Sequence, residues 1–299
     1  MRPLPEVGDM AEDAAHRTIW LDRLLVGTLL SLALLMPGPW YVIFYLRGAA
    51  IAGCLFANVR REPLFWVALA AFQGAGIAID WTYADNHRYL AVYWSLALAL
   101  GLSLSGTAQW DCLRVQSRLL LGLVSLFATG WKLSSGEYLS GDFFEYTLLT
   151  DDRFSAKVHH LLGVPATDLR ANRQLVDTIL ASVPDLAQPI TSGRLLSSPW
   201  VRSFALFLTW SGVILEGALA FVFLCPTPDS HWGHRLNWAR DGLLWLFLLG
   251  TYAIAPVLGF GGILAMMGAT QTTSLRRANI YFALLVVLQL LEVTFQYRV

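Results

Sequence analysis

The sequence has few charged residues. Asp, Glu, Lys and Arg make up only 14% of its 299 residues, whereas soluble domains usually contain about 25%. The 21 basic and 21 acidic residues cancel, so no net charge would attract nucleic acid. Hydrophobic residues make up 56% of the chain and the mean hydropathy is +0.53. This composition excludes a disordered chain, a coiled coil and a basic nucleic-acid-binding protein, and it predicts a polytopic membrane protein.

Cysteine and lysine are also scarce. Cys54, Cys112 and Cys225 lie far apart without a C-x-x-C motif, which argues against a disulfide framework or a zinc knuckle. Lys132 and Lys157 are the only lysines, and every other basic residue is an arginine, which does not lose its proton. The sequence contains no phosphate-binding loop, dinucleotide-binding or zinc-protease motif, and we predict no metal site.

The long apolar runs predict an all-α bundle of about eight or nine transmembrane helices. A helix needs about 20 apolar residues to cross about 30 Å of hydrocarbon. Strands are not expected, because the runs lack a period of two and an open sheet edge cannot face lipid. The predicted spans are 19–36, 40–59, 63–80, 87–105, 116–133, 200–224 and 278–296.

The apolar run 241–271 is long for one crossing and short for two, and Pro256 and three glycines interrupt it. We favour two short or broken helices there. Short loops rich in arginine mark the cytoplasmic side, which favours a cytoplasmic N-terminus. We therefore expect a multi-pass protein of a bacterial inner membrane, in contact with the lipid bilayer. The first apolar run should be a retained anchor, because no signal-peptide pattern precedes it.

These spans divide the chain into four parts. Residues 1–17 form a polar tail, 18–133 a first group of five spans, 134–199 an insertion outside the membrane, and 200–299 a second group of helices. The insertion contains a helical pattern. It is either a surface insertion of short helices or a lid or docking surface over a site at the outer face.

Several polar residues reach the same predicted depth. The fourth span opens after Asp85 and Asn86 with His87, and the fifth ends near Lys132, both at the outer boundary. An ammonium held partly out of water loses its preference for the charged form, and a neutral lysine can act as a base. The simpler alternative is that Lys132 extends to the lipid headgroups beside Glu137, and that Asp85 and Asn86 only begin a helix.

Charged residues inside spans are costly and therefore candidates for function. Arg47 lies within the second span, Glu216 within the 200–224 span and Glu292 within the last span. Arg47 and Glu216 form one conceivable structural pair. A transporter with these three residues along its path is the least favoured interpretation.

Two motifs are Asn86-His87-Arg88-Tyr89-Leu90, which opens the fourth span, and Gly130-Trp131-Lys132-Leu133, which ends the fifth. A later stretch, SGVILEGALAFVFL, carries Glu216. With these motifs, roughly residues 19–145 and 200–270 resemble the membrane domain of vitamin K-dependent gamma-carboxylases and their bacterial relatives, the HTTM group. The large extramembrane domain of full carboxylases does not follow in this sequence.

The resemblance implies a reduced quinone, such as vitamin K hydroquinone, as cofactor. Lys132 would be the base that deprotonates it, and Asn86 and His87 would support the intermediate. The expected substrate-binding residues are Asp85, Tyr89, Trp131, Glu216 and Tyr252, the last standing where relatives often carry a histidine. A small peptide or protein at the outer face is the expected further substrate. The alternative is a non-catalytic HTTM protein that serves as an export, immunity or partner-binding subunit.

Overall fold

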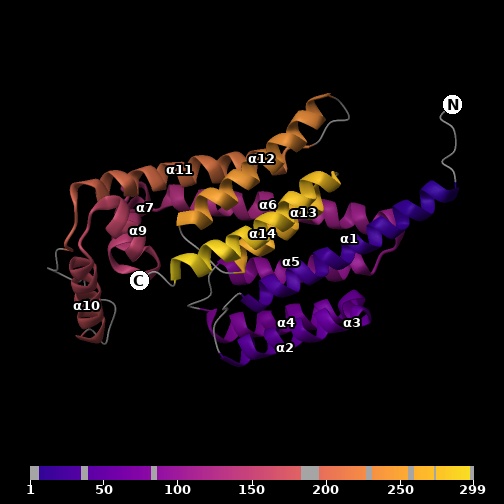
Figure 1. Ribbon diagram of the computed structural model, residues 1–299, viewed down its shortest axis with the longest axis horizontal. Helices are drawn as coiled ribbons and strands as arrows, with labels where there is room; N and C mark the ends of the chain where they lie inside the picture. The colour runs from indigo at the N-terminus through magenta and orange to yellow at the C-terminus, as the bar shows by residue number, and fades with distance from the viewer. Residues whose placement is uncertain are drawn as a thin grey trace.

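The structure is a computed structural model that describes residues 7–34, 40–81, 86–182, 195–226, 231–254, 259–272 and 274–296. Within these ranges all regular structure is helical and no strand occurs, which confirms the all-α prediction. Long helices lie side by side along one axis, and the two termini lie at opposite ends of the bundle (Figure 1).

The first group of helices agrees closely with the predicted spans. Three differences concern helix bounds. The first helix begins at Val7, so part of the predicted polar tail is helical, and the predicted span 40–59 is interrupted at Phe56, whose backbone is extended. The helix that contains the predicted span 116–133 begins ten residues earlier, at Gly106. The helices are α1 (Val7–Leu34), α2 (Trp40–Leu55), α3 (Ala57–Arg61), α4 (Pro63–Ile79), α5 (Asn86–Leu102) and α6 (Gly106–Ser134).

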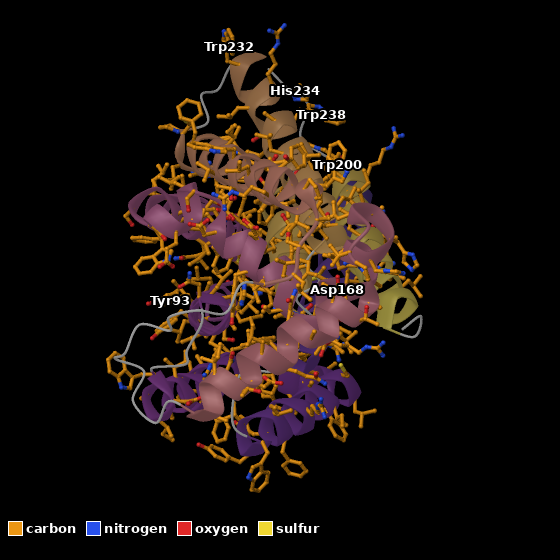
Figure 2. All side chains as sticks on the ribbon, turned by 90° about the vertical axis from the view of Figure 1, so that its left-hand side faces the viewer. Tyr93, Asp168, Trp200, Trp232, His234 and Trp238 are labelled. Carbon is orange, nitrogen blue, oxygen red and sulfur yellow. The ribbon has the colours of Figure 1, made fainter. Side chains whose placement is uncertain are left out.

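Four short helices follow α6, and they gather at the end of the bundle opposite the N-terminus (Figure 1). Figure 2 views the molecule from this end, where α10, which carries Asp168, crosses in front of the long helices. They are α7 (Gly136–Leu139), α8 (Asp142–Thr150), α9 (Asp152–Leu162) and α10 (Ala166–Ser182). We call them the insertion.

An ion-pair cluster attaches the insertion to the next long helix, α11 (Pro199–Leu224). The Arg202 guanidinium of α11 donates to both Asp142 and Glu145 of α8, the latter at 2.8 Å. Hydrogen bonds from Ser140 and Arg202 lower the pKa of the Asp142 carboxyl. These contacts hold α8 against α11.

Two helices cover the run 241–271, as the sequence predicts. The first, α12 (His231–Ile254), begins ten residues before the run and has 24 residues, so it is not short. The second, α13 (Phe260–Gln271), is buried at every residue. The last helix is α14 (Leu275–Gln296). The first turns of α12, which carry Trp232 and Trp238, project beyond the neighbouring helices (Figure 2).

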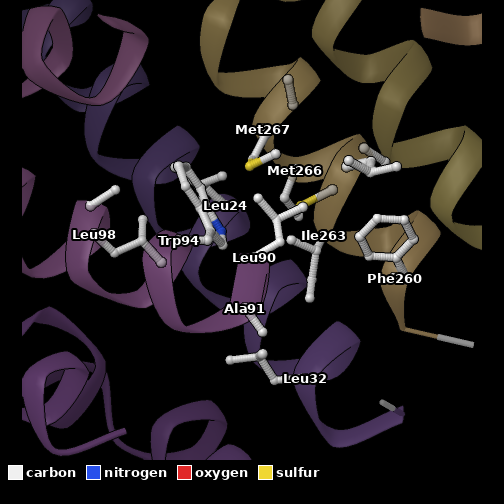
Figure 3. Close-up of a cluster of buried hydrophobic side chains, with 14 of the residues drawn as sticks. Leu24, Leu32, Leu90, Ala91, Trp94, Leu98, Phe260, Ile263, Met266 and Met267 are labelled. Carbon is white, nitrogen blue, oxygen red and sulfur yellow. The ribbon is translucent and has the colours of Figure 1, made fainter. Parts of the chain in front are cut away.

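The main hydrophobic core lies between α1, α5 and α13. Leu90 and Trp94 of α5 face Ile263 and Met266 of α13 across this core (Figure 3). A side chain at Gly27 of α1 would collide with the Met266 side chain, so glycine permits the close approach of α1 to α13. The core therefore fixes α13 at the centre of the bundle.

A fully buried carboxylate ties the last three helices together. Asp241 of α12 accepts hydrogen bonds from Arg277 and Tyr281 of α14 at 2.5 and 2.9 Å, and from Gln271 of α13 at 2.6 Å. Because a buried charge is stable only when paired and hydrogen-bonded, this network restricts how α12, α13 and α14 pack together.

Two of the described helices, α6 and α11, are long and apolar enough to cross a membrane. The helices α2 and α4 are similarly apolar but shorter, at 16 and 17 residues.

Candidate functional site

Lys132 lies in the last turn of α6, where a cation is favoured by the exposed carbonyls of the helix end. Its ammonium is 2.6 Å from Oε1 of Glu216 on α11, and both side chains are mostly buried, at 18% and 11% exposure. The predicted alternatives for these two residues are not formed. Arg47 is exposed on α2 rather than paired with Glu216, and Lys132 pairs with Glu216 rather than with the exposed Glu137.

The second carboxylate oxygen of Glu216, Oε2, is buried and has no hydrogen-bond partner among the described residues. Leaving a buried acceptor unpaired costs about 1–3 kcal/mol, and more when it is charged. Glu216 is held in place because it belongs to the buried stripe of α11, which also includes Val213, Ala220 and Phe223 at helical spacing. The geometry therefore supplies a fixed acceptor for which the described residues provide no donor.

Tyr138 closes one side of the ion pair. Its ring centroid is 5.1 Å from Nζ of Lys132, within the range of a cation–π interaction. The chain turns at Ser135 and places α7 back over the end of α6, and Thr209 of α11 donates to the Tyr138 carbonyl at 3.2 Å. Burial, helped by the Glu216 carboxylate, raises the pKa of Tyr138, so its phenol stays protonated at neutral pH.

The ion pair lies in the wall of a cavity of about 200 Å³, which we call the Lys132 cavity. Asn86 and His87, from the first turn of α5, line the same cavity. The backbone N–H groups of a helix N-terminus carry partial positive charge, which favours an anion nearby. The rest of the wall is mainly apolar and includes Val124, Leu219, Phe247 and Phe260.

Four of the predicted site residues therefore meet in one cavity: Asn86, His87, Lys132 and Glu216. The His87 ring lies on Phe260, with centroids 4.0 Å apart. This contact orients His87 at the entrance to α5.

The other predicted site residues lie elsewhere. Tyr252 is buried behind Phe260, with ring centroids 6.4 Å apart, and does not line the cavity. Tyr89 is 38% exposed and Trp131 is 73% exposed, and neither lines the cavity. Asp85 lies outside the described residues. Trp131 is exposed while its neighbour Lys132 lines the cavity, because successive residues on a helix point about 100° apart.

The sequence analysis did not select Tyr138, Phe260 or Ser125, although each borders the ion pair or the cavity. The break at Ser135-Gly136 was the available signal for Tyr138, since a chain that turns after Lys132 brings the following residues back over it. Among the described residues, no group of three or more His, Cys, Asp or Glu side chains could hold a metal.

Comparisons with known proteins found no matching family model, no similar curated protein and no similar solved structure.

The ion pair makes a prediction about stability. Glu216→Leu removes the partner of a mostly buried ammonium and should lower the free energy of unfolding by up to about 3–5 kcal/mol. Adding Lys132→Met should recover most of that loss, because two apolar side chains replace a buried pair at little cost. Denaturant unfolding of the detergent-solubilised protein measures both variants.

Glu137→Leu is the matched control, since Glu137 is an exposed carboxylate five residues beyond Lys132 and should change stability by less than about 0.5 kcal/mol. If the double variant were less stable than Glu216→Leu alone, the two side chains would not be coupled as described.

Proposed function

We propose that this protein is a multi-pass membrane enzyme that removes a proton from a hydroxyl group of an apolar substrate in the Lys132 cavity. The observation that carries this proposal is the Lys132–Glu216 pair in the wall of a mainly apolar cavity, with Oε2 of Glu216 unpaired among the residues that the structure describes. Apolar pockets that contain a few convergent polar groups are the usual form of small-molecule sites.

The surface supports a membrane location. Large apolar side chains are exposed along the long helices, including Phe44 (75%), Phe127 (71%) and Phe221 (69%). Soluble proteins rarely expose apolar surface on this scale. The buried helix α13 is only 12 residues long, or about 18 Å, and a short helix at membrane depth is tolerated when protein surrounds it.

The charges favour an orientation. Arg60 and Arg61 end α3, and Arg235 lies near the start of α12. The end of the bundle that holds α3 and the start of α12 also holds the start of α1 (Figure 1). Basic residues concentrate in cytoplasmic loops. We therefore place the N-terminus in the cytoplasm and the insertion on the outer side.

The proposed step is a proton transfer to the ion pair. A substrate hydroxyl donates to Oε2 of Glu216, its O–H bond breaks as the new O–H bond of the carboxylic acid forms, and the electron pair stays on the substrate oxygen. The Lys132 ammonium and the N-terminal turn of α5, with Asn86 and His87, stabilise the resulting anion. The role proposed for Lys132 as a lone base becomes, in this geometry, a role shared with Glu216.

The resemblance to the gamma-carboxylase and HTTM membrane domains makes a hydroquinone the first substrate to test. A hydroquinone combines an apolar ring with an acidic hydroxyl, which suits an apolar wall with one buried acceptor. The apolar surroundings also exclude water from the anion once it forms. As the resemblance implies, that anion would then react with one O2, with one oxygen atom entering the quinone epoxide and the other leaving as hydroxide, while the hydroquinone supplies the electrons.

Activity provides the direct prediction. Purified protein in lipid nanodiscs, given vitamin K hydroquinone and oxygen, should form the epoxide, measured by chromatography. Lys132→Met and Glu216→Gln should each lower the rate by about 10²–10⁴-fold, because a positioned acid–base group typically contributes that much.

Arg47→Met and Glu137→Gln are the controls, since they remove an exposed cation and an exposed carboxylate and should leave the rate unchanged. Retention of full activity by correctly folded Lys132→Met would remove the pair from the mechanism. Absence of epoxide from all variants and from the wild type would favour the non-catalytic HTTM alternative.

The orientation is tested by cysteine labelling. In a variant without the three native cysteines, single cysteines at Thr107, beside the start of α6, and at Arg170 of α10 should react on opposite sides of the membrane. A membrane-impermeant maleimide added to intact cells should label Arg170→Cys and leave Thr107→Cys unlabelled until the cells are lysed. Equal labelling of both in intact cells would contradict the proposed orientation.

A further inference from the structure

A second cavity, of about 300 Å³, lies beneath the insertion, and we call it the insertion cavity. Its wall comes from α8, α9, α11 and the last residue of α12, and it includes Leu148, Phe154, Phe204 and Ile254. These side chains belong to a small hydrophobic cluster separate from the main core. The cavity therefore has its own walls and shares no lining residue with the Lys132 cavity.

The polar side chains of this wall are basic. Lys157, the second of the two lysines in the chain, and His160 line the cavity, and its described lining residues include no acidic side chain. Both come from α9, whose buried residues Phe154, Val158 and Leu162 recur every four positions and fix its orientation.

Lys157 is held at the cavity wall. Its Nζ donates to the carbonyl of Ile254 at 2.7 Å. Ile254 is the last residue of α12, and the last carbonyls of a helix lack partners within that helix. This hydrogen bond joins α9 of the insertion to the end of α12 and holds the Lys157 ammonium at the edge of the apolar space.

The surroundings indicate which molecules reach this cavity. Leu161, which lines it, is 72% exposed, and Phe143 of α8 and Phe207 of α11 are 50% and 61% exposed. Aromatic and apolar side chains at a bundle end are typical of the boundary between lipid and water. Molecules dissolved in that boundary layer are therefore the candidates for binding.

We propose that the insertion cavity binds a long-chain fatty acid, with its chain in the apolar space and its carboxylate at Lys157 and His160. The volume is at the lower end for small-ligand pockets, which suits one acyl chain rather than the two of a phospholipid. A single ammonium matches a single carboxylate, and a charged hydrogen bond of this kind gives an anion preference. The proposal does not depend on chemistry at Lys132.

Photocrosslinking tests the proposal in the full-length protein in nanodiscs of neutral phospholipid. A diazirine analogue of palmitic acid should crosslink to α9 or to the adjoining part of α11, as mapped by mass spectrometry. Unlabelled palmitate should compete, and methyl palmitate should compete about ten- to a hundredfold less well, because it lacks the charge that Lys157 recognises.

Lys157→Met should weaken labelling by a similar factor and Lys157→Arg should restore it. Ala156→Trp, which fills the cavity without changing its charge, should abolish it. Arg153→Met removes another cation of the same helix, outside the cavity lining, and should label like the wild type. Binding at this site is read without any activity measurement, so its failure is distinct from failure of the proposed enzyme function.

Equal competition by methyl palmitate, or unchanged labelling of Lys157→Met, would overturn the assignment of the carboxylate to Lys157. Competition by an anionic phospholipid as strong as that by palmitate would overturn the assignment to a free fatty acid.

Discussion

The candidate site depends on the Lys132–Glu216 ion pair, which is mostly buried between α6 and α11. Removing two charges from water costs several kcal/mol for each ion, and their attraction repays this only when geometry and further hydrogen bonds are favourable. The Lys132–Glu216 contact at 2.6 Å supplies the attraction, and the Tyr138 ring supports the cation. Within the described part of the chain, Oε2 of Glu216 has no hydrogen-bond partner. This incomplete satisfaction is better explained by a binding role than by stability alone.

Other helices surround the pair and form the wall of the Lys132 cavity. The α6 and α11 helices carry its two members, α5 adds the polar turn with His87, and α13 supplies Phe260 from the centre of the bundle. The Asp241 network holds α12, α13 and α14 together at a different level. The insertion begins directly after Lys132 and contributes Tyr138, so the extra helices are part of the site's wall as well as of a second cavity.

Part of this arrangement could be predicted from the sequence. Runs of apolar residues give the approximate ends of helices, and alternation of direction then places Lys132 and His87 at one level. The partner of Lys132 could not be predicted, because it depends on the rotation of α11 about its own axis. The same reason separates Trp131, which is exposed, from Lys132, which faces the cavity. The position of Tyr138 depends on a chain reversal at Ser135, which the pattern of apolar residues does not predict.

The central claim is that Glu216 receives a proton from the substrate. Difference infrared spectroscopy of the nanodisc-embedded protein, recorded as a hydroquinone binds in the absence of oxygen, observes this directly. The account predicts loss of a carboxylate band and gain of a buried carboxylic acid band in the wild type, and absence of both changes in Glu216→Gln. Binding of the hydroquinone with no change in carboxyl absorption, or with the same change in Glu216→Gln, would contradict the account.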